Sequence, residues 1–159
     1  MPVALYRVDE RLIHGQVVVG WGSQLRPDRY LVVDAAVAKS EWEQELYALG
    51  VPDGTQVEFW SPDEARGSLK AWEESDLTSV LLTRDLHTFL ELARGGLLEG
   101  RALNVGGLHL RKGREEILPY LFLDPSDRAS LRSLEVEGLL ISAQDLPGSQ
   151  KVALEDLLV

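Results

Sequence analysis

The stretch VALYRVDERLIHGQVVVGWGSQL, residues 3–25, contains the pattern that decides the fold. It begins with a β-rich run (3–8), continues through a loop crowded with charge (9–14), and ends in an amphipathic stretch that we expect to be helical (15–25). The same order, a short β-rich run followed by a longer amphipathic stretch, recurs along the chain. This alternation is typical of βαβ units and of a parallel sheet covered on both faces.

The pattern predicts the following further elements. The other β-rich runs are YLVVD (30–34), TQVEFW (55–60), SVLLT (79–83), ALNVGG (102–107), YLFLD (120–124) and GLLIS (138–142), and the other helices are expected over 38–49, 62–74, 85–95 and 125–136. The stretch GLHLRKG is too short for a helix, so one crossover is expected to be a loop or a hairpin. The sequence therefore predicts one α/β domain over residues 1–159. We expect an open, mainly parallel sheet with helices on both faces and room for one antiparallel strand at an edge.

Composition excludes several classes of function. The chain has 159 residues and a net charge of −10, which would repel a phosphate backbone, so nucleic acid is not an expected partner. It has no cysteine, hence neither disulfides nor thiolate metal sites. Its apolar runs fall far short of the ~20 residues needed to cross a bilayer. We expect a cytoplasmic protein whose contact with a membrane is peripheral.

The charged loop has the features of an anion site that contains a nucleophile. In an open α/β sheet, ligands bind at the carboxyl ends of the strands, and residues 9–14 form the first loop at that edge. His14 is expected at the start of the helix, where backbone N–H groups are free, and Gly15 lets the backbone approach a ligand closely. Arg7 and Arg11 add positive charge in a geometry that suits phosphate.

These charges predict the chemistry of the histidine. Neighbouring arginines should lower the pKa of His14, and the neutral imidazole is the nucleophilic form. Phosphoryl transfer to nitrogen is thus within the reach of this loop, and Asp9 can either hold one ring nitrogen or cap the helix. Spacing alone is equally compatible with a solvated turn that contains an arginine–carboxylate network and a capping histidine.

Other candidate residues lie at the same edge of the sheet. Gly106 and Gly107 end a strand expected beside the first loop, where they either allow close approach to a ligand or serve a tight turn. Asp34 also ends a strand, where it either caps a helix or contacts the site, and helix capping is slightly favoured. His87 and His109 lack the spacing of metal ligands, so neither a metal nor a cofactor is predicted.

The quoted residues also carry a resemblance. RVDERLIHGQVVVGW resembles the active-site segment of enzyme IIB subunits of the mannose/fructose/sorbose family of the phosphoenolpyruvate-dependent sugar phosphotransferase system (PTS). The segments YLVVDAAVAKSEWEQELYALGVPDGTQVEFWSPDEA, ALNVGGLHLRKG and LEVEGLLI follow the family's order, so the resemblance covers nearly the whole chain. It implies an α/β phosphotransferase that accepts a phosphoryl group from enzyme IIA and passes it to a sugar taken up through membrane subunits IIC and IID.

The resemblance also assigns roles by position. It implies that His14 is phosphorylated, that Arg7 and Arg11 bind phosphate, and that Asp9 is their partner in the loop. Gly15 and Gln16 complete the motif.

The chain departs from many relatives at two positions. Ala35 stands where they have a second acid, and Glu10 replaces a common aspartate. These departures leave open a regulatory module that is switched by phosphorylation of the histidine and modifies no sugar. A simple binder of anions or phosphosugars is a third interpretation. The sequence names neither the sugar nor the oligomeric state.

Overall fold

A computed structural model describes residues 2–159, and its main sheet confirms the predicted α/β architecture. Seven strands lie in the order β3-β2-β4-β1-β5-β8-β9, all parallel except the last, which pairs antiparallel to β8 at one edge. The strands are β1 (Val3–Val8), β2 (Arg29–Val33), β3 (Gln56–Trp60), β4 (Ser79–Thr83), β5 (Ala102–Val105), β8 (Leu140–Ala143) and β9 (Val152–Ala153).

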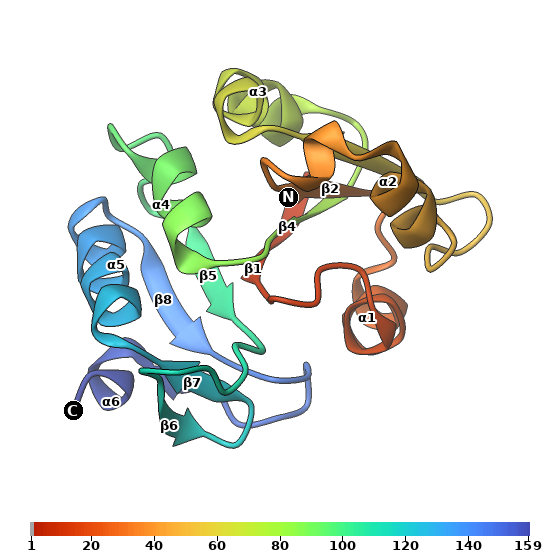
Figure 1. The fold of residues 1–159 in the computed structure, drawn as a ribbon. Coiled ribbons are helices and arrows are strands. Elements are labelled where there is room, and N and C mark those ends of the chain that lie inside the picture. The colour runs from red at the N-terminus through yellow and green to blue at the C-terminus, as the bar shows by residue number, and fades with distance from the viewer. Residues whose placement is uncertain (1) are drawn as a thin grey trace.

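Helices cover both faces of this sheet (Figure 1). Alternate strand residues point to opposite sides, so each face has its own hydrophobic cluster. One cluster lies under α3 (Pro62–Glu74), α4 (Leu86–Ala93), α5 (Pro125–Val136) and α6 (Leu154–Leu157). The other lies under the π-helical segment η1 (Gln16–Trp21), which continues into α1 (Gly22–Leu25), and under the 3₁₀ turn η2 (Val37–Lys39) with α2 (Glu41–Ala48).

The helix starts follow from capping residues in the sequence. The side chain of Ser61 accepts a hydrogen bond from the backbone of Glu64, and Pro62 opens α3. Asp124 and Asp127 form a reciprocal capping box at the start of α5. These two helices occupy the predicted residues 62–74 and 125–136, whereas the predicted helix 38–49 is broken at Ser40, whose backbone is extended.

The stretch GLHLRKG (107–113), expected to be a loop or a hairpin, is a loop, and a hairpin follows it. Strands β6 (Glu115–Leu118) and β7 (Leu121–Leu123) pair antiparallel in a separate two-stranded sheet. The run 120–124 is therefore a strand outside the main sheet. It is hydrophobic because Leu121 and Leu123 are buried in the cluster on the α4–α5 side. Throughout residues 2–159, each helix is too short or too polar to cross a membrane.

Candidate functional site

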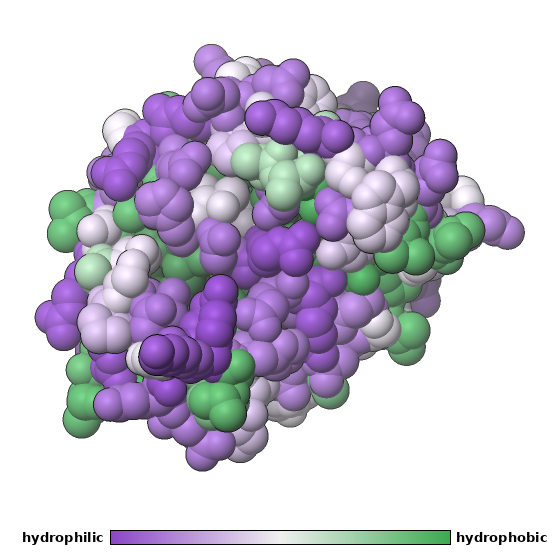
Figure 2. All heavy atoms as spheres, viewed as in Figure 1, coloured by the Kyte–Doolittle hydropathy of each residue, from purple (hydrophilic) through white to green (hydrophobic). Residues whose placement is uncertain are grey.

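The loops of the site come together because β1 lies in the middle of the sheet. Val8, at its end, pairs with Thr83 of β4 on one side and with Val105 of β5 on the other. The loop after β1 (9–15) therefore lies beside the loop after β5 (106–109), and backbone bonds from Gly106 to Val8 and from Glu10 to Gly107 join the two loops. In Figure 1 the first of these loops runs from the middle of the view to α1, and Figure 2 shows a largely hydrophilic surface over the centre of this face.

The loop after β1 has an unusual backbone at Leu12. Its φ of 56° lies in the left-handed region, which costs a side-chain-bearing residue about 1–2 kcal/mol. Leu12 and Ile13 are both buried in the cluster on the η1 side. Burying a leucine side chain contributes roughly 1.5–3 kcal/mol, enough to offset the strain and to fix the loop that leads to His14.

Asp9 organises the polar part of the loop. Its fully buried carboxylate accepts hydrogen bonds from Arg7 (Nη2, 3.2 Å), from Arg11 (Nε, 3.2 Å, and Nη2, 3.2 Å) and from the backbone N–H of Gly107 (3.2 Å). Burial alone would raise the pKa of Asp9, but the hydrogen bonds from Arg11 and the charge of Arg7 lower it. Asp9 is therefore a carboxylate that holds two arginines. It accepts a further bond from the backbone N–H of Arg11 (3.1 Å) and does not cap η1.

Arg7 lies beneath the loop rather than on the surface. Its side chain is 0% exposed, donates to the side chain of Asn104 and to the carbonyls of Gln144 (2.8 Å) and Asp145 (3.0 Å), and lies 5.2 Å from the ring centre of Trp21. The sequence suggested that Arg7 would bind phosphate directly. In this structure its guanidinium has no open side toward solvent, and its neighbours are the sheet and Asp9.

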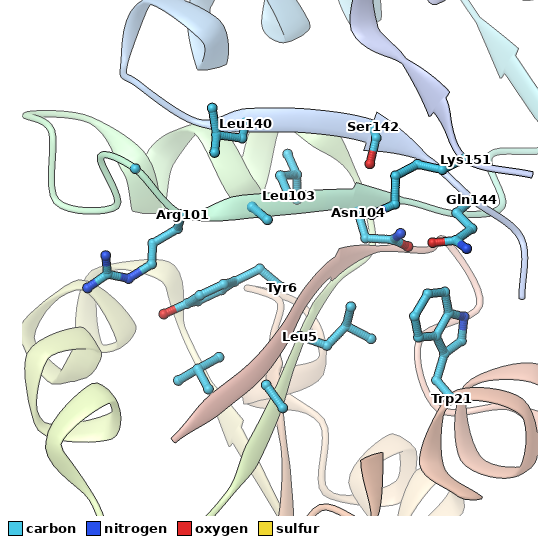
Figure 3. Close-up of a pocket in the computed structure, with 14 residues that line it drawn as sticks. Leu5, Tyr6, Trp21, Arg101, Leu103, Asn104, Leu140, Ser142, Gln144 and Lys151 are labelled. Carbon is cyan, nitrogen blue, oxygen red and sulfur yellow. The ribbon is translucent and has the colours of Figure 1, made fainter. Parts of the chain in front are cut away.

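A cavity of about 300 Å³ is lined by residues of β1, β5 and β8, and two of its lining residues, Asn104 and Gln144, accept hydrogen bonds from Arg7. Figure 3 shows Asn104 and Gln144 close together at the ends of these strands, with Trp21 nearby. Neither His14 nor Arg11 lines this cavity. The cavity is therefore separate from the residues to which the sequence analysis assigned phosphoryl chemistry.

The two residues after β5 are glycines because the arginine side chains leave no room for a Cβ there. A Cβ on Gly106 would overlap the guanidinium of Arg7, and one on Gly107 would lie 3.1 Å from Nη2 of Arg11. Neither glycine has a positive φ. Their predicted place beside the first loop is confirmed, and the close approach that they allow is to two side chains of this chain.

Arg11 is the arginine that faces solvent. Its side chain is 32% exposed, and besides Asp9 it donates to Oε1 of Gln16 (2.7 Å), so Gln16 holds the guanidinium in place. A Cβ on Gly15 would meet no atom within 4 Å, which leaves open space next to His14. The loop thus presents one accessible guanidinium and one open position beside the histidine.

His14 is partly buried and is held by the backbone. Its Nδ1 lies 2.8 Å from the carbonyl oxygen of Leu12, and its Nε2 lies 3.7 Å from Oδ2 of Asp9, beyond hydrogen-bond distance. Asp9 therefore does not hold the ring by a hydrogen bond, and the Leu12 carbonyl does. The pKa of His14 is lowered, as predicted, but burial is the main cause; the charges of Arg11 and Arg7 contribute less, and Asp9 opposes them.

One cluster beside the site was missed from the sequence. Nδ1 of His109 lies 2.6 Å from Oε2 of Glu10, and the nearly buried side chain of Arg114 bridges Glu10 (3.1 Å) and Asp127 (3.1 Å). Because Glu10 and His109 are about a hundred residues apart, no spacing rule joins them. The one available signal was that a strand adjacent to β1 would end just before His109.

Two other candidates lie outside the site. Asp34 accepts a hydrogen bond from the backbone N–H of Val37 (3.0 Å) at the start of η2, whose N-cap position is Ala36, and its other oxygen pairs with Arg84 (3.3 Å). His87 is exposed on α4 and pairs with Glu91 (3.2 Å) one helical turn away.

This chain is similar to bacterial sugar-transport proteins. Residues 3–159 match the family described as PTS system sorbose subfamily IIB component. The N-acetylgalactosamine-specific phosphotransferase enzyme IIB component 1 of Escherichia coli is 30% identical over 97% of both chains, and the sorbose-specific EIIB component of Klebsiella pneumoniae is 28% identical over 98% of this chain and 94% of that one. Two crystal structures share the fold. The IIB domain of the Klebsiella pneumoniae sorbose permease has a TM-score of 0.87 and 27% identity, over 99% of this chain and 96% of that one. The E. coli N-acetylgalactosamine-specific IIB component 1 has a TM-score of 0.85 and 29% identity, over 94% of this chain and 97% of that one.

Proposed function

Because this chain belongs to the sorbose subfamily of PTS IIB components, which are phosphotransferases that act as phosphocarriers in sugar uptake, we propose that His14 is the residue that carries the phosphoryl group. The observation that carries the proposal is a histidine with a lowered pKa beside an exposed guanidinium and an open position. A neutral imidazole has the lone pair that attacks phosphorus, and Arg11 supplies positive charge where the oxygens of the phosphoryl group gather.

The residues of the site have different proposed roles in binding the phosphoryl group. Arg11 binds the phosphoryl group, and Gly15 leaves room for it. Arg7 and Asp9 are positioning residues, because the buried Arg7 holds Asp9 and Asp9 holds Arg11. In the structure Nδ1 of His14 is bonded to Leu12 and Nε2 is buried without a partner, so the ring turns before it accepts phosphate.

Gln16, Gly106 and Gly107 support the same loop. Gln16 fixes Arg11, and the two glycines make room for the guanidinium groups. Asp34 lies at the same edge of the sheet, outside this loop, and pairs with Arg84, which lines a cavity together with Glu10.

Enzyme IIA is the proposed phosphoryl donor. The mannose-specific relative from E. coli, 25% identical, is named an EIIAB component, and this chain matches 49% of its length. That name joins a IIA part to a IIB part in one protein, which supports a IIA partner for this chain. Residues 1–159 act as one phosphocarrier domain, and the donor docks over the loop at 9–15 and the neighbouring strand ends.

A sugar is the proposed final acceptor, reached at the cytoplasmic face of the membrane through subunits IIC and IID. Relatives of this chain are named for N-acetylgalactosamine, sorbose, fructose and mannose, which favours sugar phosphorylation over a purely regulatory switch.

A pulse and chase of labelled phosphate tests the proposed function. The chain is incubated with labelled phosphoenolpyruvate, enzyme I, the phosphocarrier protein and a matching IIA, and is then mixed with membranes that contain matching IIC and IID subunits and a sugar. We expect label on the chain, followed by its appearance in sugar phosphate. Label that never reaches the chain contradicts the carrier function, and label that stays on the chain with every sugar favours the regulatory module.

A further inference from the structure

The pairing of His109 with Glu10 points to a second functional imidazole at this site. We propose that His109, oriented by Glu10, is the general base that takes the proton of the acceptor hydroxyl when the phosphoryl group leaves His14. The inference rests on the proposed function, since it assigns the proton in the second of the two transfers.

The first observation is where the free nitrogen of His109 lies. A Cβ on Gly107 would be 3.5 Å from Nε2 of His109, 3.1 Å from Nη2 of Arg11 and 3.5 Å from Oδ1 of Asp9. These three groups therefore surround one small space. Nε2 of His109 and the guanidinium that we assign to the phosphoryl group thus lie next to the same position at Gly107, and half of the His109 side chain is exposed.

The second observation fixes the tautomer. Nδ1 of His109 lies 2.6 Å from Oε2 of Glu10, and because a carboxylate oxygen only accepts hydrogen bonds, Nδ1 carries the hydrogen and donates it. Nε2 is then the nitrogen with the lone pair. A carboxylate that orients an imidazole in this way is the arrangement by which enzymes keep a histidine ready to accept a proton.

The third observation is that Glu10 is itself held. Its Oε1 pairs with Arg114 (3.1 Å), whose side chain is only 2% exposed and also binds Asp127, and its Oε2 accepts the backbone N–H of His109 (3.2 Å). Arg114 also donates to the carbonyl of His109 (2.9 Å), so both the backbone N–H and the backbone C=O of His109 are hydrogen-bonded to this cluster.

Only one of the two transfers releases a proton from an acceptor. When phosphate passes from IIA to His14, a neutral ring nitrogen attacks and no hydroxyl takes part. When it passes to the sugar, the N–P bond breaks with its electron pair on the His14 ring, an O–P bond forms, and the hydroxyl proton moves to Nε2 of His109 and then to solvent. A base beside the site is therefore needed in the second transfer alone.

The test compares the two half-reactions in wild type, His109→Gln and His87→Gln. His87 with Glu91 is a matched control, because it is an exposed histidine–glutamate pair within α4. The first half-reaction is the rate of labelling of the chain by phospho-IIA. The second is the loss of label from the purified phosphoprotein to water, and to N-acetylgalactosamine or sorbose with membranes that contain matching IIC and IID subunits.

We expect His109→Gln to be labelled at the wild-type rate and to transfer its phosphate on the order of 100-fold more slowly, at the low end of what general bases contribute. His87→Gln should match wild type in both half-reactions. Glu10→Gln should slow only the second half-reaction, and less than His109→Gln does, because the amide can still accept a bond from Nδ1.

Three results would overturn the inference. Equal slowing of both half-reactions would make His109 an anion-binding residue, and wild-type rates in both would make its pairing structural. Loss of label to water and to sugar at the wild-type rate, with labelling slowed, would place His109 in donor docking. If wild type itself is never labelled by phospho-IIA, the proposed function fails, which is a different outcome from all three.

Discussion

At the scale of single residues, the site depends on a buried carboxylate more than on its exposed charges. Asp9 holds Arg7 from below and Arg11 from the side, and it also accepts the N–H of Gly107. The resemblance implied that Arg11 binds phosphate and that Asp9 is only its partner in the loop. In the structure Asp9 has two roles, because it supports the fold as well as the site.

Asp9→Ala should therefore destabilise the protein. It leaves the fully buried Arg7 without its carboxylate, and breaking a buried pair costs about 3–5 kcal/mol. Chemical denaturation of wild type and Asp9→Ala measures the free energy of unfolding. A loss below about 1 kcal/mol, the range of exposed pairs, would show that Asp9 does not hold the buried network.

Arg11→Ala should leave the fold intact and slow phosphorylation of His14 on the order of 10²–10³-fold, the effect of removing one group that stabilises developing charge. Arg128→Ala is the control, since Arg128 lies on α5 and pairs with Glu115 on the hairpin. Labelling by phospho-IIA gives the rates. A rate for Arg11→Ala equal to that of the control would remove Arg11 from the mechanism.

His14 should titrate below its ordinary value of 6.5, because burial disfavours the charged ring. The native state then binds fewer protons than the unfolded chain, so the contribution of His14 to stability is complete above pH 6.5. It is lost as the pH falls from 6.5 through the lower native pKa. NMR titration of the ring protons gives the midpoint, and denaturation of wild type against His14→Gln gives the slope. A midpoint above 6.5 would contradict the buried neutral ring.

At the scale of elements, the ends of β1 and β5 pack closely because Gly106, just after β5, has no side chain at the place occupied by the guanidinium of Arg7 from β1. Gly106→Ala should disrupt this contact, because the new Cβ would overlap Arg7, which cannot retreat from its bonds to Asn104 and Gln144. We expect a loss of about 1–3 kcal/mol, the usual cost of overpacking. Gly148→Ala, where a Cβ would meet open space, is the control for thermal denaturation. Equal melting temperatures would contradict the packing account.

The element scale also shows what the sequence could and could not predict. Helices α3 and α5 were predicted at their observed residues because the signals at their starts, a proline and acidic residues in the first turn, are local in the chain. The π-helical turn of η1 and the left-handed Leu12 have no such signal, since burial in the tertiary structure imposes them. The pairing of Glu10 with His109 was missed for the same reason, as only the order of the strands brings it about.

At the scale of the whole molecule, the parallel sheet gathers residues that are distant in the sequence at one edge. Because β1 lies between β4 and β5, the loop with His14 has neighbours on two sides. Although the chain as a whole is acidic, it presents an arginine beside the proposed nucleophile. The open α/β sheet and the position of the first loop were both predicted, since they follow from the alternation of strands and helices and from the rule that ligands bind at the carboxyl edge. The inward direction of Arg7 was not predicted, because a sequence does not show which side of a loop is covered.

The central claim is that His14 carries the phosphoryl group, and mapping the labelled residue tests it most directly. Wild type, His14→Ala, His87→Ala and His109→Ala are phosphorylated through IIA, and the label is located by intact mass and peptide mapping and followed in acid and in alkali. We predict label on His14 in wild type and in the two other histidine variants, lost in mild acid and retained in alkali, because protonation makes imidazole a good leaving group. Folded His14→Ala should take up none. Label that persists in folded His14→Ala, or that is stable to acid in wild type, would contradict both the nucleophile and the carrier function that rests on it.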